Sequence, residues 1–202
     1  MSEKTNRFAG QSLGIRLLFI AALGCCISLS TLEAVSATTP SPAKGPLRLL
    51  ESNPRYFTDG TGKAIYLTGL HIWNNLQDWN HEPSLEYTAY LRLLESYNHN
   101  FFRMWTWEHA AVPQPQGKWP NDPLPYERTG PGQDLSGLPK FDLTKLNQDY
   151  FDRLRSRVQE AGDRGIYVAV MLFQGFSIEG KGDRPNPWPG HPYNLNNNVN
   201  VL

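Results

Sequence analysis

The sequence has few cysteines and no excess charge of either sign. Among its 202 residues are two cysteines, Cys25 and Cys26, and 19 basic residues balance 19 acidic ones. Both cysteines lie in an N-terminal stretch that we expect to be removed, so the mature chain has neither a disulfide framework nor a thiolate metal site. A chain without excess positive charge has no electrostatic preference for nucleic acid or another polyanion. Arg153 and Arg157, four residues apart, are typical of a solvated helix face.

The sequence also lacks an apolar run long enough to cross a membrane. Leu17–Leu29 has 13 residues, whereas a transmembrane helix needs about 20. Basic residues precede this run, and Val35-Ser36-Ala37 follows it with the small-x-small pattern that signal peptidase accepts. We therefore predict a secretory signal peptide over residues 1–37, cleavage near Ala37, and a secreted or periplasmic protein without membrane attachment after cleavage. A lipoprotein signal at Cys25 is the alternative, which the continuation of the apolar run past this cysteine disfavours.

Signatures of several catalytic classes are absent. There is no H-E-x-x-H pair for zinc, no G-x-S-x-G nucleophile turn, no P-loop and no dinucleotide-binding fingerprint. The histidines of the mature chain show no ligand spacing. We therefore predict no cofactor and no metal ion.

The remaining chain divides into a short linker and one folded part. Residues 38–50, which are rich in proline at their start, are predicted to be an extended linker, and residues 51–202 should form the fold. Apolar runs on both sides of Asp59-Gly60 predict a hairpin, because glycine accepts the positive φ of a tight turn. The second run, Ala64–Leu70, is apolar enough to continue as a buried strand.

A helix and a second strand should follow. Ser84 can act as the N-cap of the helix, apolar residues recur at helical spacing through about Tyr97, and Asn98 can provide a left-handed stop. The run Phe101–Trp105 then predicts a strand. The 34 residues from Glu108 to Phe141 include seven prolines and four glycines, so we expect a long, irregular loop of functional importance.

A second helix and a third strand complete the regular part. Asp142 can cap a helix whose apolar positions recur every three or four residues through Ala161, and Gly162–Gly165 should end it. Ile166–Phe173 is continuously apolar, as expected of a strand covered on both faces. The order hairpin, strand, helix, strand, helix, strand predicts an α/β fold with parallel strands. The chain from Gln174 onward is polar, rich in proline and asparagine, and without periodicity.

Side chains that could bind a ligand follow each predicted strand. They are His71, Trp73 and Asn74 after the first strand, Trp107 and Glu108 after the second, and Gln174 after the third. Since α/β folds place their active sites at the carboxyl ends of parallel strands, these residues form the predicted substrate-binding site.

The tryptophans are predicted to bind sugar rings, because the apolar C–H face of a sugar can stack on an aromatic surface. Alternation along a strand puts Arg103 and Trp105 on the same inward side. We therefore expect Trp105 in the core and Trp107 as the sugar platform. His71 and Glu108 can hydrogen-bond sugar hydroxyls, and the alternative is that both are solvated loop residues.

Several segments resemble the first strands of clan A glycoside hydrolases, a clan that includes the family 5 cellulases. Phe101-Phe102-Arg103 is similar to their second barrel strand, Gly165–Leu172 to their third, and the Asp59-Gly60 hairpin leading into Leu67-Thr68-Gly69 to their first, while Pro125–Gly132 and Lys140–Leu143 resemble secreted cellulase-like proteins. The likeness covers about Arg55 to Leu202.

The resemblance implies the N-terminal part of a (β/α)8 TIM barrel that hydrolyses O-glycosidic bonds of a polysaccharide or oligosaccharide with retention. It also implies that Arg103 supports the catalytic nucleophile electrostatically, because an arginine favours the ionised form of a nearby carboxylate. In the clan, a glutamate after asparagine on the fourth strand is the acid/base, and a glutamate on the seventh is the nucleophile. This sequence reaches three strands and has no Asn-Glu pair, so we expect it to stop before its catalytic glutamates.

Two alternatives stay open. Glu108 could itself be catalytic and pair with Glu179, because the carboxylates of an inverting enzyme lie roughly 6.5–9.5 Å apart and neighbouring strand ends can meet that distance. The other alternative is a barrel fragment without catalysis, which either binds carbohydrate or has no function.

Overall fold

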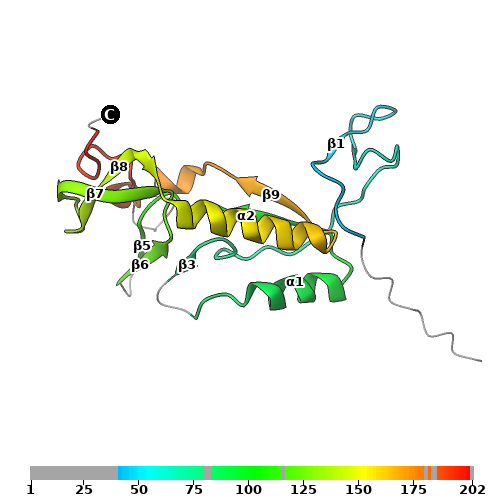
Figure 1. Ribbon diagram of the computed structural model, residues 1–202, viewed down its shortest axis with the longest axis horizontal. Coiled ribbons are helices and arrows are strands. Elements are labelled where there is room, and N and C mark those ends of the chain that lie inside the picture. Colours follow the sequence, from blue (N-terminus) through cyan, green and yellow to red (C-terminus); the bar gives the residue numbers. More distant parts are fainter. Residues whose placement is uncertain (1–40, 80–82, 115–116, 180–181, 183–185, 201–202) are drawn as a thin grey trace, which may run out of the picture. The chain divides into compact units, whose positions relative to one another are not determined.

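The structure, a computed structural model, describes residues 41–79, 83–114, 117–179, 182 and 186–200 (Figure 1). The predicted signal peptide over residues 1–37 lies outside the described residues. In chain order the elements are β1 (Arg48–Leu49), β2 (Phe57–Thr58), β3 (Asp78–Trp79), α1 (Tyr87–Ser96), β4 (Phe101–Trp105), β5 (Ala111–Gln114), β6 (Gly117–Asp122), β7 (Tyr126–Gln133), β8 (Pro139–Leu146), α2 (Gln148–Asp163) and β9 (Tyr167–Met171), followed by 3-10 turns at Gly175–Ser177 and Trp188–Gly190.

β4 and β9 form a parallel two-stranded sheet. Their register pairs Phe101 with Tyr167 and Trp105 with Met171. α2 lies between the two strands in sequence and packs along β9 (Figure 1). The second and third predicted strands therefore form, and they are direct neighbours. β9 is half-buried along its length rather than covered on both faces as expected.

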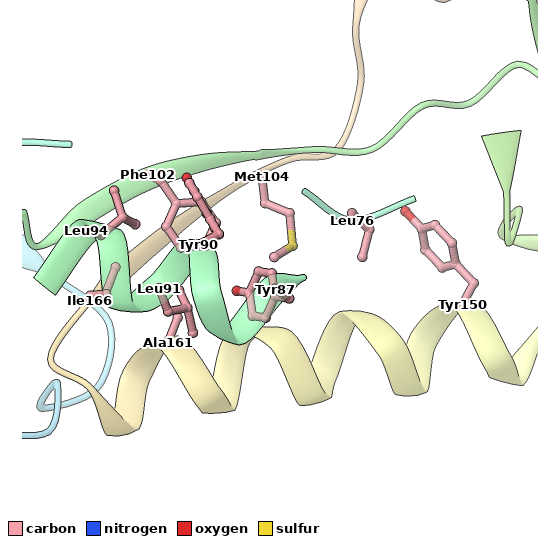
Figure 2. Close-up of a cluster of buried hydrophobic side chains, with 10 residues drawn as sticks. All are labelled: Leu76, Tyr87, Tyr90, Leu91, Leu94, Phe102, Met104, Tyr150, Ala161 and Ile166. Carbon is pink, nitrogen blue, oxygen red and sulfur yellow. The ribbon is translucent and has the colours of Figure 1, made fainter. Parts of the chain in front are cut away.

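The hydrophobic core lies where α1 and α2 pack on one face of this sheet (Figure 2). Phe102 and Met104 of β4 are buried together with Leu91 and Leu94 of α1. Because alternate residues of a strand point to opposite faces, Phe102 and Met104 enter the core while Arg103 between them does not. Burial of each such large apolar side chain contributes about 1.5–3 kcal/mol to folding.

Both helices form, but neither begins at its predicted cap. α1 begins at Tyr87, and Glu86 precedes it without a capping side-chain hydrogen bond, so the prediction of Ser84 as N-cap is wrong. α2 begins at Gln148, and the side chain of Asn147 caps it by accepting from the N–H of Asp149 at 3.2 Å. Asp142 lies in β8 and instead accepts hydrogen bonds from Thr144.

The predicted ends of the two helices are confirmed. Asn98, just beyond α1, has a positive φ of 55°. Gly165, just beyond α2, has a φ of 74°. Both residues adopt the left-handed conformation that commonly ends a helix.

Polar contacts also join the two helices. The hydroxyl of Tyr87 donates to the backbone oxygen of Arg157 at 2.8 Å, and the guanidinium carbon of Arg157 lies 4.8 Å from the centre of the Tyr87 ring. At the other end, Arg164 of the α2 C-cap pairs with Glu95 of α1 at 2.9 Å. These contacts fix α1 against α2 around the core.

The predicted strand Ala64–Leu70 does not form. Among the described residues, the β-bridge made by this segment is a single antiparallel pair between Ile65 and Phe57. Further along, Thr68 exchanges hydrogen bonds with Asn100: the Asn100 N–H donates to the Thr68 oxygen and the Thr68 N–H donates to Asn100 Oδ1, both at 3.0 Å. One of these two bonds uses a side chain, so the segment runs beside the start of β4 without a regular ladder.

β2 is the first strand of the predicted Asp59-Gly60 hairpin. Its Phe57 bridges Ile65 across the turn, and β2 also pairs with β1. Leu49 lies opposite Phe57 in this antiparallel pair. β1 lies inside residues 38–50, which we expected to be linker. Gly60 has a φ of 91°, as the turn prediction requires.

Gly69 approaches β4 so closely that only glycine fits. A Cβ built on Gly69 would lie 1.6 Å from the backbone oxygen of Phe101. No side-chain rearrangement can relieve a clash between a Cβ and a backbone atom, so this contact requires glycine.

The segment Glu108–Phe141 contains two antiparallel hairpins, so the prediction of a long irregular loop is wrong. β5 pairs with β6, which also pairs with β3, and β7 pairs with β8. The register of β7 and β8 shifts between Arg128 and Gln133, where Pro131 and Gly132 lie. Proline and glycine are tolerated in edge strands and at bulges, and this explains how strands form in a segment whose composition indicates a loop.

Asparagine side chains organise the C-terminal described segment. The amide of Asn197 donates to the backbone oxygens of Pro189 at 2.8 Å and His191 at 2.9 Å. Its neighbour Asn198 forms a parallel bridge with Phe141 of β8. The polar, asparagine-rich composition therefore supports an ordered turn structure that lies against β8.

Candidate functional site

Four aromatic rings from two separate segments gather at the carboxyl end of β4. The ring centroid of Trp73 lies 5.5 Å from that of His71, 5.0 Å from that of Trp105 and 5.9 Å from that of Trp107. Trp105 and Trp107 are stacked, with 5.9 Å between centroids and 20° between planes. We call these four residues the aromatic cluster. Three of them, His71, Trp73 and Trp107, belong to the predicted site.

The burial of the two tryptophans at the end of β4 differs from the expectation. Trp107 is only 6% exposed, and its Nε1–H donates to the backbone oxygen of Trp73 at 2.7 Å. Trp105, expected in the core, is half-buried, and Trp73 is 50% exposed. Stacking requires an accessible ring face, so the buried Trp107 cannot be the platform that we expected, whereas the ring of Trp73 is accessible.

Two buried amide side chains bind the backbone at the end of β4. Asn75 donates to the Arg103 oxygen at 2.7 Å and accepts from the Trp105 N–H at 3.1 Å. Gln77 donates to the Trp107 oxygen at 2.9 Å and accepts from the Trp107 N–H at 2.6 Å. Neither side chain is exposed. Together they replace the backbone of a neighbouring strand and hold Trp105 and Trp107 in place.

Sequence reasoning missed this role of Asn75 and Gln77. The available signal is their spacing of two residues, which is the period of a strand. Asn74, the residue we did select, is half-buried, and no hydrogen bond of its side chain is recorded in the described part of the chain.

Arg103 is exposed and lies beside the aromatic cluster. Its guanidinium carbon is 5.6 Å from the centroid of the Trp105 ring, a distance at which a cation and an aromatic face attract. Burial, and then the charge of Arg103, lower the pKa of His71. Among the described residues no carboxylate forms an ion pair with Arg103, so the nucleophile it was expected to support is not found there.

Glu108 follows Trp107 and, by alternation, points to the other side of the chain. Its Oε2 accepts the backbone N–H of Gln174 at 3.2 Å, and the Gln174 side chain donates to the Thr106 oxygen at 3.2 Å. The Thr106 hydroxyl in turn donates to the Met171 oxygen of β9. Burial raises the pKa of Glu108, and the hydrogen bond from Gln174 opposes this shift. The structure therefore brings Glu108 and Gln174 together.

A two-lobed cavity opens beside Glu108. Its lobes have volumes of about 400 and 230 Å³, and both are lined by Glu108, Phe173, His191 and Tyr193. Glu179 is exposed and lines neither lobe. The geometry therefore offers nothing in favour of a catalytic pair between Glu108 and Glu179.

His109 is a further buried group that sequence reasoning did not select. Its Nδ1 lies 2.8 Å from the Ser177 hydroxyl, and Asn121 donates to its backbone oxygen at 2.7 Å. Burial lowers the pKa of His109 to about 3, so its ring is neutral at ordinary pH. It joins the end of β4 to the turn Gly175–Ser177.

Within the described ranges, no three histidine, cysteine, aspartate or glutamate side chains converge as they would around a metal ion. In the same ranges, no helix has the length and apolar character needed to cross a membrane.

Comparison with known protein families identifies a matching family. Residues 51–192 match a family described as apiosidase-like, catalytic domain. No curated protein and no solved structure matches the chain significantly. The matched range includes the whole aromatic cluster, β4, β9 and the residues that line the cavity up to Pro192.

Proposed function

This chain belongs to the apiosidase-like catalytic-domain family, and we propose that it is a secreted glycoside hydrolase-like protein whose aromatic cluster binds a sugar of an O-glycoside substrate. The family is a glycosidase family, and this supports the glycoside hydrolase-like character expected from the strands. The location of the site is inferred from one observation: the indole of Trp73 is half-exposed and packs on Trp105 and Trp107. Flat aromatic surfaces of this kind complement the apolar faces of sugar rings.

We assign the following roles within this site. Trp73 stacks on a sugar ring, and His71 at its edge hydrogen-bonds a hydroxyl group. His71 suits that role because its lowered pKa keeps the imidazole neutral, so it can donate or accept a hydrogen bond. Arg103 places a positive charge beside the same face and would favour an ionised carboxylate close to the sugar.

The parallel pair β4 and β9 supports a proposal for the wider fold. We propose that they are adjacent strands of a (β/α)8 barrel, with α2 as the crossover and the aromatic cluster at the carboxyl ends, where such barrels place their sites. The likeness to clan A, including its cellulases, is the basis for proposing hydrolysis with retention.

The name of the matched family directs the choice of substrate. We propose polysaccharides or oligosaccharides that carry apiose as the first class to test. Hydrolysis with retention needs two carboxylates about 5 Å apart, and the described residues do not place such a pair at the aromatic cluster. Carbohydrate binding without catalysis is therefore the second candidate function.

Binding and hydrolysis assays with one pair of variants test the proposal. Trp73→Ala removes the platform, whereas Tyr66→Ala removes an aromatic residue that is 85% exposed and lies outside the cluster. We expect Trp73→Ala to bind about 5- to 30-fold more weakly to an affinity gel that contains apiose-bearing polysaccharide, since loss of a stacked ring costs about 1–2 kcal/mol. Tyr66→Ala should bind the gel as the wild type does. Release of reducing sugar would establish catalysis, and retention in the gel without release would favour the binding-only alternative. Equal retention by both variants would remove the aromatic cluster from the site.

A further inference from the structure

Four aromatic side chains from two parts of the chain, β7 and residues 188–193, lie around the cavity beside Glu108. The rings of Trp188 and His191 have centroids 5.0 Å apart, those of His191 and Tyr193 lie 5.1 Å apart, and those of Tyr193 and Tyr126 lie 5.9 Å apart. The hydroxyl groups of Tyr126 and Tyr193 are hydrogen-bonded at 2.6 Å. The four rings therefore form a continuous arc.

Among the described residues, the cavity inside this arc is lined by one acidic side chain and by no lysine or arginine. The acidic side chain is that of Glu108. In the described part of the chain, the one hydrogen-bond donor to Glu108 is the backbone N–H of Gln174. The neighbouring His191 supplies no positive charge near neutral pH, because burial lowers its pKa to about 4.

A half-buried carboxylate without a positive partner is an unfavourable arrangement in a folded protein. An opposite charge in the cavity would relieve it, and the faces of Trp188, Tyr193 and Phe173 would attract the same charge through their quadrupoles. A neutral ligand gains neither advantage. The combination of one carboxylate and several aromatic faces is the chemistry that recognises alkylated or primary ammonium groups.

We propose that the cavity between Glu108, Trp188 and Tyr193 binds a small organic ammonium ion. Its larger lobe, about 400 Å³, is in the size range of small-ligand sites. The ammonium group would lie against Glu108 and between the aromatic rings. Two sources carry this group, a quaternary alkylammonium and an amino sugar, and they differ in the remainder of the molecule.

The site does not depend on the sugar site of the proposed function. Trp73 and Trp105 line neither lobe of the cavity, and the buried Trp107 lines only the smaller lobe, not the larger one beside Trp188. An ammonium ion could therefore bind whether or not the aromatic cluster binds a saccharide, and Trp73→Ala separates the two: it should lose saccharide binding and keep ammonium binding.

Calorimetric titration with three probes tests the proposal. Tetramethylammonium supplies the charge alone, glucosamine supplies it on a sugar ring, and glucose is the matched uncharged ring. We expect saturable binding of tetramethylammonium, of glucosamine or of both, with glucose at least about tenfold weaker, which corresponds to about 1.4 kcal/mol. The charged probe that binds more tightly identifies the source.

Two variants and one control locate the binding. Glu108→Gln removes the charge, Trp188→Ala removes one ring, and Glu179→Gln removes an exposed carboxylate outside the cavity. We expect at least about tenfold loss for Glu108→Gln and Trp188→Ala and no change for Glu179→Gln, with folding of each variant checked by circular dichroism. Failure of both ammonium probes to bind, binding of glucose as tight as that of the better charged probe, or full binding by folded Glu108→Gln would each overturn the proposal.

Discussion

Trp107 and Glu108 are adjacent in sequence, but their side chains lie in different environments. The Trp107 ring stacks on Trp105 and contacts Trp73. Glu108 faces the cavity and accepts the N–H of Gln174. Because alternation continues beyond the end of β4, Trp107 packs into the aromatic cluster while Glu108 lies in the cavity, whose smaller lobe Trp107 also lines.

The electrostatic state of Glu108 leads to a prediction about stability. Burial raises the pKa of Glu108 in the folded state, so the folded protein binds this proton more readily than the unfolded chain does. The ionised carboxylate therefore lowers the free energy of unfolding above its unfolded pKa, and this cost disappears as the pH falls. We expect Glu108→Gln to raise the melting temperature at about pH 7 and to raise it less at about pH 5.

Thermal melts at the two pH values check this expectation. Tyr126 and Tyr150, which also face Glu108, have raised pKa values and stay neutral across this range. His191 has a pKa lowered to about 4 and stays largely neutral. Glu179→Gln is the exposed control and should change neither melt. A lower melting temperature for Glu108→Gln at about pH 7 would contradict the assignment of burial as the cause.

At the scale of elements, β4 pairs with the backbone of β9 along one edge. Near its carboxyl end, its other hydrogen bonds are made by side chains, where a neighbouring strand would usually supply backbone groups. Asn75 contacts the backbone of Arg103 and Trp105, and Gln77 contacts that of Trp107. These contacts determine where the tryptophan rings lie. The positions of Trp105 and Trp107 in the aromatic cluster therefore depend on two buried residues, Asn75 and Gln77.

Asn75→Ala tests the support of β4. The substitution leaves the buried N–H of Trp105 and the oxygen of Arg103 without their partner, and an unsatisfied group of this kind costs about 1–3 kcal/mol. We expect a loss of this size in the free energy of unfolding, measured by urea denaturation. The adjacent Asn74→Ala should change the same quantity by less than about 0.5 kcal/mol. Equal effects of the two substitutions would show that the Asn75 contacts do not stabilise β4.

Gly69→Ala tests the close approach at the start of β4. The added Cβ would meet the backbone oxygen of Phe101 at 1.6 Å, so Gly69 or β4 must move, at a cost of about 1–3 kcal/mol or more. Gly162→Ala is a matched control, because its Cβ would meet nothing within 4 Å in α2, and alanine is the better helix former by about 1 kcal/mol. We expect opposite signs for the two changes in urea denaturation, and a tolerated Gly69→Ala would contradict the packing of this segment.

Elements with a strong local pattern could be predicted from the sequence, and those made by distant contacts could not. The apolar runs of β4 and β9 and the stop signals Asn98 and Gly165 led to the correct elements. The run Ala64–Leu70 has the composition of a strand, but the side chains of Asn100 and Asn75 occupy the places where its ladder would form. Nothing local to that run indicates this competition.

The candidate site shows the same division. The position of Trp107, Glu108 and Gln174 beyond β4 and β9 was predicted, because it follows from the order of elements, whereas the strand expected before His71 and Trp73 does not form. The burial of the site residues was not predicted, because Trp107 is covered by Trp73 and Gln77 from another part of the chain. The arc around Glu108 was likewise missed, because Trp188 and Tyr193 lie 80 or more residues further along in a segment without periodicity.

At the scale of the whole described chain, one face of the β4–β9 sheet has no helix on it. The core residues Phe102 and Met104 occupy the other face. The register places Ala169 beside Arg103 on the uncovered face, and Phe173, just beyond β9, is 75% exposed. Uncovered sheet surfaces of this kind promote association.

Sedimentation analysis over a range of concentrations tests this property. We expect the protein to self-associate, and we expect Ala169→Lys to shift the distribution toward the monomer because it places a second positive charge beside Arg103. Ala89→Lys, on the exposed side of α1, is the control and should leave the distribution unchanged. A wild-type protein that stays monomeric at every concentration would contradict the exposed-face argument.

The most direct test of the central claim, that the aromatic cluster binds sugar, is an NMR titration of the tryptophan indole N–H signals. The chain has six tryptophans, and each signal can be assigned by substitution. On addition of an apiose-bearing oligosaccharide, we expect saturable shifts of the Trp73 and Trp105 signals and no shift of the Trp188 signal. Unchanged Trp73 and Trp105 signals at saturating oligosaccharide, or a shift confined to Trp188, would contradict the account.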